Sequence, residues 1–166
     1  MSGQDSDGVS TDFRLALRGI AATVCIVATT DGTHKRGMTV TSVTSVSLDP
    51  PAILVCVNKS ASINEILRVA DGFSVNILSS AQQAVSNAFS GALSAEERFE
   101  VGDWQEDPRT GLPYLADAQS TILCNKSAAF PIGTHMIVVG DVSRVASNQS
   151  CDPLIYHNAD YAALTK

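Results

Sequence analysis

The stretch GMTVTSVTSVSL (Gly37 to Leu48), followed by Asp49-Pro50-Pro51 and AILVCV (Ala52 to Val57), decides how the fold is interpreted. Hydroxyl-bearing and apolar residues alternate from Gly37 to Leu48, which is typical of a strand with one buried face. The two prolines lack amide hydrogens, so a sheet ladder must end there. The apolar, β-branched run that follows predicts a further strand over Ala52–Val57.

Other extended runs lie on both sides of this stretch. The run Thr23–Thr30 is apolar on both alternating faces, so one face should meet the core and the other a second element or subunit. The remaining strands are expected over Phe73–Leu78, Ser120–Ala129, His135–Ala146 and Leu154–Tyr156, with a turn at Asp31-Gly32, a break at Pro131-Ile132-Gly133 and a loop over Asp103–Asp117.

Helices are few and short. Residues Asp12–Ala22 place Phe13, Leu17 and Ile20 on one helix face. Capping boxes predict three more helix starts, at Ser62 with Glu65, Ser80 with Gln83 and Ser94 with Glu97. Several short strands with few helices favour a small β-barrel over a layered α/β fold.

Composition indicates one domain and excludes several classes of protein. The chain has 166 residues, of which 45% are hydrophobic and 17% charged, and this is enough for one buried core. We expect a flexible tail over residues 1–11 and one domain over residues 12–166. A net charge of −6 leaves no broad basic face, so no nucleic-acid partner is expected.

The location follows from the termini and the cysteines. The N-terminus is polar and acidic, unlike a secretion signal, and no apolar stretch reaches the ~20 residues that a membrane-spanning helix needs. We therefore expect a soluble, cytoplasmic protein without a membrane partner. Its four cysteines form no CxxC pair and are expected to be structural thiols, and the scattered histidines predict no metal site.

Two segments have side chains suited to a ligand. The hydroxyls of Gly37–Ser47 could line a groove for a flat heteroaromatic ring, although an ordinary Thr/Val strand has the same pattern. The run Cys56-Val57-Asn58-Lys59-Ser60-Ala61-Ser62 joins a strand end to a helix start, where a phosphate would find amides, hydroxyls and an ammonium group. The simpler alternative is that Ser62 only caps the helix and Lys59 is a surface charge.

The motifs resemble one family over nearly the whole chain, from about Phe13 to Tyr161. The runs GMTVTSVTSVSLDPPAILVCVNKSASINEIL, FSVNIL, GLPYLADA, GTHMIVVGDV and PLIYHNADY look like the flavin reductase domain of the FMN-binding split-barrel group. The resemblance implies a mainly β fold, a six-stranded Greek-key split β-barrel with short peripheral helices. It also implies a homodimer with flavin near the subunit interface, which would explain the doubly apolar strand at Thr23–Thr30.

The resemblance also implies site residues. Thr39, Val40, Thr41 and Ser42 would contact the isoalloxazine, and Ser45, Val46 and Ser47 would lie along the ribityl and phosphate side. Cys56 ends the strand before Asn58, Lys59, Ser60 and Ser62, which would hold the phosphate. His135 matches the histidine of a Gly-Asp-His motif that borders the nicotinamide. This chain departs from the pattern at Thr134, which replaces the Asp, and at Thr41, which is often Asn.

The activity expected from the resemblance is that of an NAD(P)H-dependent flavin reductase. It would transfer a hydride from NADH or NADPH to FMN or FAD and supply reduced flavin to a partner monooxygenase. Because the cofactors carry this chemistry, no nucleophile, metal or carboxylate pair is needed. Two alternatives remain: a non-catalytic flavin-binding or electron-carrier protein on the same barrel, and a pyridoxine phosphate oxidase, which would need more basic residues for a second phosphate.

Overall fold

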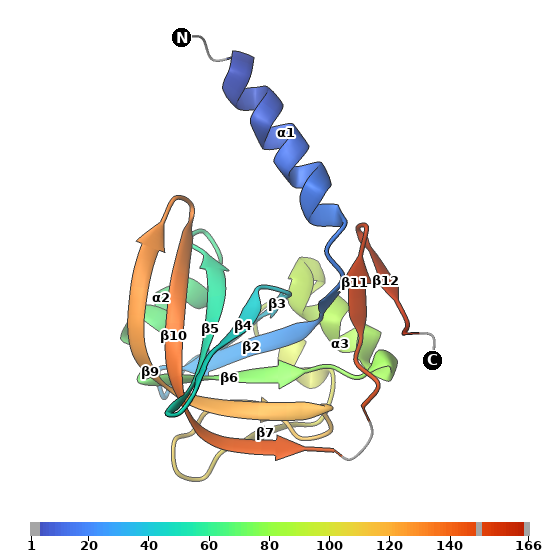
Figure 1. The fold of residues 1–166 in the computed structure, drawn as a ribbon. Helices are drawn as coiled ribbons and strands as arrows, with labels where there is room; N and C mark the ends of the chain where they lie inside the picture. The colour runs from blue at the N-terminus through green and yellow to red at the C-terminus, as the bar shows by residue number, and fades with distance from the viewer. Residues whose placement is uncertain (1–3, 149–150, 165–166) are drawn as a thin grey trace.

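A seven-stranded antiparallel sheet forms the body of the protein, seen in a computed structural model that describes residues 4–148 and 151–164 (Figure 1). Every neighbouring pair in this sheet is antiparallel, and the sheet curls into a barrel. In order across the sheet, the strands are β3 (Lys35–Val40), β2 (Cys25–Thr30), β6 (Gly72–Ile77), β9 (Ser120–Ile132), β10 (His135–Ser147), β5 (Pro51–Asn58) and β4 (Val43–Leu48).

The barrel is split where one edge strand passes into the other. Strands β3 and β4 lie at opposite edges of the sheet but are consecutive in the chain, joined only by Thr41 and Ser42. The Val43 amide donates to the Thr41 carbonyl at 3.1 Å, which tightens this bend. The run predicted as one strand over Gly37–Leu48 is therefore two strands, and the sheet has seven strands where six were expected.

Shorter elements surround the barrel. The strands β1 (Ala22–Thr23), β11 (Ile155–His157) and β12 (Asp160–Ala162) form a second sheet, and β7 (Trp104–Glu106) pairs with β8 (Pro113–Leu115). The helical elements are α1 (Gln4–Arg18), α2 (Ile63–Val69), η1 (Ser80–Gln82), α3 (Gln83–Asn87), η2 (Ala88–Ala92) and η3 (Glu97–Glu100). No helix in the described part of the chain combines the length and apolar character that a bilayer crossing requires.

The first helix differs from the prediction at both ends. It runs from Gln4 to Arg18, so most of the expected tail is helical, and it stops before Gly19 instead of reaching Ala22. The apolar stripe of Phe13 and Leu17 continues one turn earlier at Val9, which favours the longer helix. Residues 1–3 of the expected tail lie outside the described residues. Figure 1 shows α1 projecting away from the barrel, with its C-terminal end beside the β11–β12 hairpin.

The predicted capping boxes have three different outcomes. The box at Ser94 and Glu97 is confirmed, since the amide of each residue donates to the side chain of the other. The second box is shifted by one residue, to Ser79 and Gln82. Ser62 precedes α2 but makes no side-chain cap hydrogen bond. The expected loop over Asp103–Asp117 contains the two short strands β7 and β8, which were too short to show a period.

Strand β2 separates two apolar cores. The inner core fills the barrel with Cys25, Val27, Val40, Ile53, Val55, Val57, Ile63, Leu67, Phe73, Val75, Cys124 and Val138. The outer core lies on the other face, made by Val24, Ile26, Leu78, Val85, Ala88, Phe89, Leu115, Ala118 and Leu154. Ile26 is 0% exposed within the single chain. The second apolar face of this strand is thus covered by the chain itself, which corrects the expectation that another subunit would explain it.

Candidate functional site

A cavity of about 410 Å³ lies beside the end of β3, and we call it the Thr39 cavity. The Thr39 hydroxyl donates to the Ser86 carbonyl at 2.7 Å, which joins β3 to α3. The Tyr161 hydroxyl lies 2.8 Å from Ser86 Oγ and 2.9 Å from Asn87 Oδ1. The complete lining is Val24, Thr39, Val40, Thr41, Ser86, Asn87, Ser90, Tyr156, Ala159, Asp160 and Tyr161. Hydroxyls, an amide and two aromatic rings dominate this cavity.

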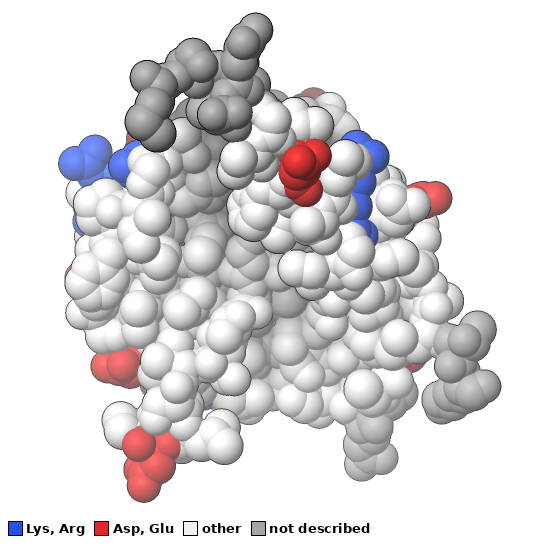
Figure 2. All heavy atoms as spheres, turned by 45° about the horizontal axis from the view of Figure 1, so that its top comes forward, with Lys and Arg blue, Asp and Glu red and all other residues white. Residues whose placement is uncertain are grey.

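A second cavity of about 420 Å³, the Arg14 cavity, adjoins the first. It is lined by Arg14, Leu17, Arg18, Ile20, Ala22, Thr41, Ser42, Tyr156, His157, Asn158 and Ala159. The two cavities share Thr41, Tyr156 and Ala159, so they adjoin at the split of the barrel, and we call the two together the groove. Figure 2 shows a largely uncharged face of the molecule that is hollowed near its middle.

The turn of the β11–β12 hairpin forms part of this groove. Asn158 and Ala159 have positive φ values of 51° and 64°, a left-handed conformation that is uncommon for residues other than glycine. The Asn158 amide donates to the Arg18 carbonyl at 3.0 Å, which holds the hairpin against the end of α1. The rings of Tyr156 and Tyr161 meet edge to face, with centroids 5.5 Å apart. Two segments from opposite ends of the chain therefore build one wall.

The loop after β5, residues 58–62, is tied to the turn between β9 and β10. The Lys59 amide donates to the Thr134 carbonyl at 2.9 Å, and Lys59 Nζ donates to the Gly133 carbonyl at 2.6 Å. Asn58 Oδ1 accepts from both the amide and the hydroxyl of Ser60. The loop can still offer the Lys59 ammonium and the Ser62 hydroxyl, but several of its amides are already used internally.

His135 begins β10 directly opposite Asn58, and its side chain is exposed. Its Nδ1 atom lies 2.9 Å from the Thr134 hydroxyl, so threonine replaces the expected Asp as the neighbour of the ring. The Cys56 amide donates to the Ser42 carbonyl, and Cys56 is paired with Ile137, two residues from His135. From strand spacings, Ser42 and His135 are about 12 Å apart.

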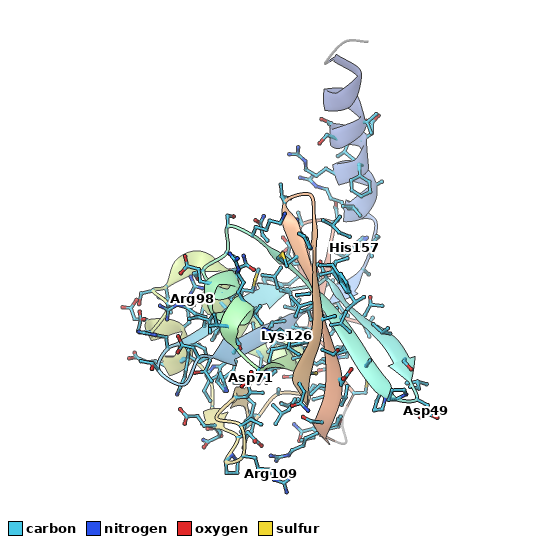
Figure 3. All side chains as sticks on the ribbon, turned by 90° about the vertical axis from the view of Figure 1, so that its left-hand side faces the viewer. Asp49, Asp71, Arg98, Arg109, Lys126 and His157 are labelled. Atoms are coloured by element: carbon cyan, nitrogen blue, oxygen red, sulfur yellow. The ribbon has the colours of Figure 1, made fainter. Side chains whose placement is uncertain are left out.

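The structure thus brings most of the predicted residues to one edge of the barrel. Thr39 to Ser42 line the cavities, and Cys56, Asn58 and His135 follow on adjacent strands. Within one chain, the register between β4 and β5 places Ser45, Val46 and Ser47 away from Asn58 and His135. Ser47 pairs with Ala52, six residues and about 20 Å along β5 from Asn58. Figure 3 shows Asp49 at the far tip of the β4–β5 hairpin, away from His157, the last residue of β11.

Several lining residues were not predicted from the sequence. Ser86 and Asn87 lie on α3, and Arg14 and Arg18 on α1, where nothing in the local pattern separates them from ordinary surface residues. Tyr161 had a detectable signal, because it ends the run PLIYHNADY that contributed to the resemblance. Its place in the cavity lining could not be predicted, because it depends on the contact between the β11–β12 hairpin and Ser86.

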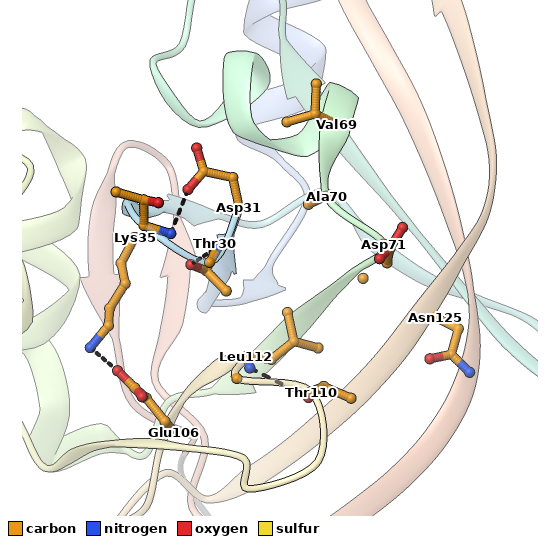
Figure 4. A pocket seen from close by; sticks show the side chains of 14 residues that line it. Thr30, Asp31, Lys35, Val69, Ala70, Asp71, Glu106, Thr110, Leu112 and Asn125 are labelled. Carbon is orange, nitrogen blue, oxygen red and sulfur yellow. Dashed lines mark hydrogen bonds and ion pairs between the residues drawn. The ribbon is translucent and has the colours of Figure 1, made fainter.

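A larger cavity of about 520 Å³ lies elsewhere, between the β2–β3 turn, the end of α2 and the loop at residues 110–112 (Figure 4). Its charged side chains are Asp31, Asp71, Glu106 and Lys35, with Lys35 paired to Glu106. The backbone amides of His34 and Thr33 hold the pKa of Asp31 below its ordinary value. Asp31 lies in the exposed turn between β2 and β3, and this cavity includes none of the predicted flavin contacts.

The cysteines and the potential metal ligands bear on the chemistry available to the groove. All four cysteines are free, and burial raises the pKa of Cys25 and of Cys124 to about 12, which keeps both thiols protonated. Among residues 4–148 and 151–164, no three His, Cys, Asp or Glu side chains are grouped so that they could hold a metal ion. The groove can bind and orient a flat polar ring, and its residues fit a flavin.

Comparisons with known proteins agree with this description. Residues 17–165 match the family described as the flavin reductase like domain. The chain is 42% identical, over 95% of its length and 88% of the relative's, to the reductase component of the FADH(2)-dependent resorcinol hydroxylase of Rhizobium sp. strain MTP-10005. It is 39% identical, over 90% of its length and 83% of the relative's, to the FMN reductase (NADH) RutF of Pseudomonas syringae pv. syringae strain B728a.

A solved structure gives the same result for the fold. The NADH:FAD oxidoreductase SgcE6 of Streptomyces globisporus C-1027, in complex with NAD and FAD fragments, superimposes with a TM-score of 0.87. The match covers 94% of this chain and 93% of the other, at 26% sequence identity. The mainly β split-barrel fold with short helices is therefore confirmed.

Proposed function

The chain belongs to the flavin reductase family, and on this premise we propose that its groove holds flavin and reduced nicotinamide together at the split of the barrel. The protein is an NAD(P)H-dependent flavin reductase that supplies reduced flavin to a partner monooxygenase. The observation that supports our placement is the bend at Thr41 and Ser42. It joins both edges of the sheet, and its residues line two adjoining cavities.

In this proposal the flavin crosses the barrel edge from ring to phosphate. The isoalloxazine contacts Thr39, Val40, Thr41 and Ser42. The ribityl chain of the flavin passes Cys56. The phosphate is bound by the loop that contains Asn58, Lys59, Ser60 and Ser62. The arrangement is supported by the hydrogen bond that places Ser42 against Cys56. Helix α2 has only seven residues, so we assign phosphate binding to the loop side chains more than to the helix end.

We assign His135 to the nicotinamide from the family resemblance, since within one chain it lies opposite Asn58, at the phosphate end of this path. When bound, flavin supplies the acceptor for the hydride of the reduced nicotinamide. The chain contributes orientation: Thr41 and Tyr156 contact ligands from both cavities, and Thr134 holds the His135 ring at Nδ1. The aromatic rings of Tyr156 and Tyr161 form part of one wall of the Thr39 cavity. No side chain needs to act as a nucleophile.

We propose a homodimer, but on grounds other than the doubly apolar strand. Large apolar side chains remain exposed on α1 and near the tips of two hairpins, outside the lining of the Arg14 cavity: Val9, Phe13, Val46, Leu48, Phe130 and Ile132. Leu48 is 89% exposed, which is costly for an isolated chain. A second copy would cover these surfaces, and Val46 with its neighbours Ser45 and Ser47 would then lie at the interface. Light scattering at micromolar concentration should give twice the monomer mass.

We also propose that the protein works in the cytoplasm, where its four free thiols would stay reduced. Separately, we propose that residues 12–166 act as one catalytic domain, whose first helix α1 begins earlier, at Gln4.

Turnover with and without flavin tests the function. The purified protein should oxidise NADH, followed by absorbance, only when FMN or FAD is supplied or retained. The alternative of a non-catalytic flavin carrier predicts that flavin binds but that NADH is not consumed. Oxidation of NADH by flavin-free protein would overturn the proposal, because the flavin is the proposed acceptor of the hydride.

A further inference from the structure

We propose that Arg14 and Arg18 bind the diphosphate of the nicotinamide dinucleotide, in the Arg14 cavity next to the site of hydride transfer. This inference rests on the proposed function and adds the residues that hold the hydride donor. The first support is position, since the cavity adjoins the Thr39 cavity and shares Thr41, Tyr156 and Ala159 with it.

The charge of this cavity is unusual for the molecule. The chain carries a net charge of −6, yet the residues that line the Arg14 cavity include two arginines and a histidine and no carboxylate. Neither arginine takes part in an ion pair within the described part of the chain. Asp160 belongs to the adjoining Thr39 cavity, where its Oδ1 accepts the Tyr161 amide at 2.8 Å. The two guanidinium groups therefore have no carboxylate of their own to neutralise.

The geometry suits a ligand with two linked anionic groups. Arg14 and Arg18 are four residues apart on α1, so their side chains share one face of the helix. Guanidinium groups bind phosphate oxygens with paired hydrogen bonds, and two of them match the two charges of a diphosphate. The cavity adds polar groups from Thr41, Ser42 and Asn158.

The structure holds this cationic helix end in place. The Arg18 carbonyl accepts the Asn158 amide, and this turn is held in a left-handed conformation at both Asn158 and Ala159. Uncommon backbone conformations of this kind are concentrated at ligand sites. The flavin phosphate is assigned to the Lys59 loop on the far side of Ser42, so the Arg14 cavity is left for the second ligand.

Equilibrium binding tests the proposal without relying on turnover. The double variant Arg14→Gln/Arg18→Gln should raise the Kd for NADH, measured by its fluorescence on protein without flavin, by about tenfold or more. The double variant Arg68→Gln/Arg109→Gln changes the net charge equally at exposed positions remote from the groove and should leave the Kd within about twofold. NADH binding to the unmodified protein should also fall more steeply with added salt than binding to the Arg14/Arg18 variant.

The same variants distinguish the possible sources of a diphosphate. Weaker binding of FAD, with FMN and NADH unchanged, would assign the arginines to the flavin dinucleotide and overturn the proposal. Unchanged binding of NADH, with unaltered circular dichroism, would overturn it too. In either case NADH oxidation by the unmodified protein with flavin would leave the proposed function intact, whereas absence of that oxidation would count against the function itself.

Discussion

The two cores on opposite faces of β2 are built in different ways. The inner core takes most of its side chains from regular strands, such as Val55, Phe73 and Val75, each 0% exposed. The outer core gathers short segments, and its aromatic rings Phe89, Phe99 and Trp104 meet at centroid distances of 5.0 to 5.1 Å. An apolar strand face that resembles a subunit interface in the sequence is thus covered by irregular segments of its own chain.

The two walls of the groove depend on different cores. Cys56, Asn58 and His135 lie on strands whose opposite faces fill the barrel, and the hydrogen-bonded ladder fixes their spacing. Ser86 is on a short helix packed over the outer core, and Tyr161 packs against that core from the C-terminal hairpin. Damage to the outer core should therefore disturb one wall of the site and leave the strand wall in register.

The largest expected effect comes from breaking the outer core at Phe89, which is 1% exposed and contacts two aromatic rings. Phe89→Ala should lower the free energy of unfolding by about 3–5 kcal/mol, because it removes buried surface and leaves a cavity. Urea unfolding followed by the emission of Trp104, the single tryptophan, reports directly on this core. Val69→Ala, at an exposed position, is the control. A loss near that of the control would mean that the outer core contributes little.

The inner core was largely predictable from the sequence, and the outer core was not. The continuous apolar run Ala52–Val57 and the β-branched and aromatic run Phe73–Leu78 locate barrel strands, because each run is encoded within its own strand. Phe89, Trp104 and Leu115 lie in segments of three to five residues, too short to show a period. Their association depends on contacts between distant parts of the chain.

The site divides in the same way. Residues on the strand wall, such as Asn58 and His135, belong to contiguous motifs and could be named from the sequence. Ser86 and Arg14 enter the groove only because α3 and α1 are placed against the C-terminal hairpin. The bend at Thr41 and Ser42 was missed as well, since the alternation continues through it and only the topology shows a change of sheet edge.

A change on the strand wall should affect catalysis and leave folding intact. His135→Ala should reduce kcat/KM for NADH by one to two decades, about 1.4–2.7 kcal/mol of transition-state stabilisation, since a positioning residue is lost. The Kd for flavin should stay within a few-fold. His34→Ala, in the remote β2–β3 turn, serves as the control. Lost flavin affinity with unchanged NADH kinetics would instead make His135 a flavin ligand.

The phosphate loop should show a smaller effect. Lys59→Ala/Ser60→Ala should weaken the binding of FMN and FAD by about 1 kcal/mol, or roughly fivefold in Kd. The effect is small because solvent screens an exposed charge-assisted contact. The Lys59 ammonium must also be shared with the Gly133 carbonyl. Riboflavin, which lacks the phosphate, is the internal control and should bind almost unchanged. Equal losses for all three flavins, measured by fluorescence quenching, would place the phosphate elsewhere.

The smallest expected effect is a pH dependence of the outer core at Asp107. This carboxylate is 3% exposed and lies in the loop between β7 and β8, the strands that carry Trp104 and Leu115. Burial favours its protonated form, but hydrogen bonds from Arg109, Thr110 and Arg144 outweigh burial and lower its pKa below the ordinary 3.8. Because the pKa is lower in the folded state, the ionised carboxylate stabilises the fold at pH values above the pKa of the unfolded state.

That contribution should disappear as the pH falls below about 4 and through the lower pKa of the folded state. Asp107→Asn cannot ionise, so its free energy of unfolding should lie below that of the unmodified protein at pH 6, and the difference should shrink toward pH 3. Asp71→Asn, an exposed carboxylate at the end of α2, is the matched control. Urea unfolding followed by Trp104 emission measures each difference. A gap that stays constant with pH would show that Asp107 supports the outer core by shape and neutral hydrogen bonds, and that its charge contributes nothing.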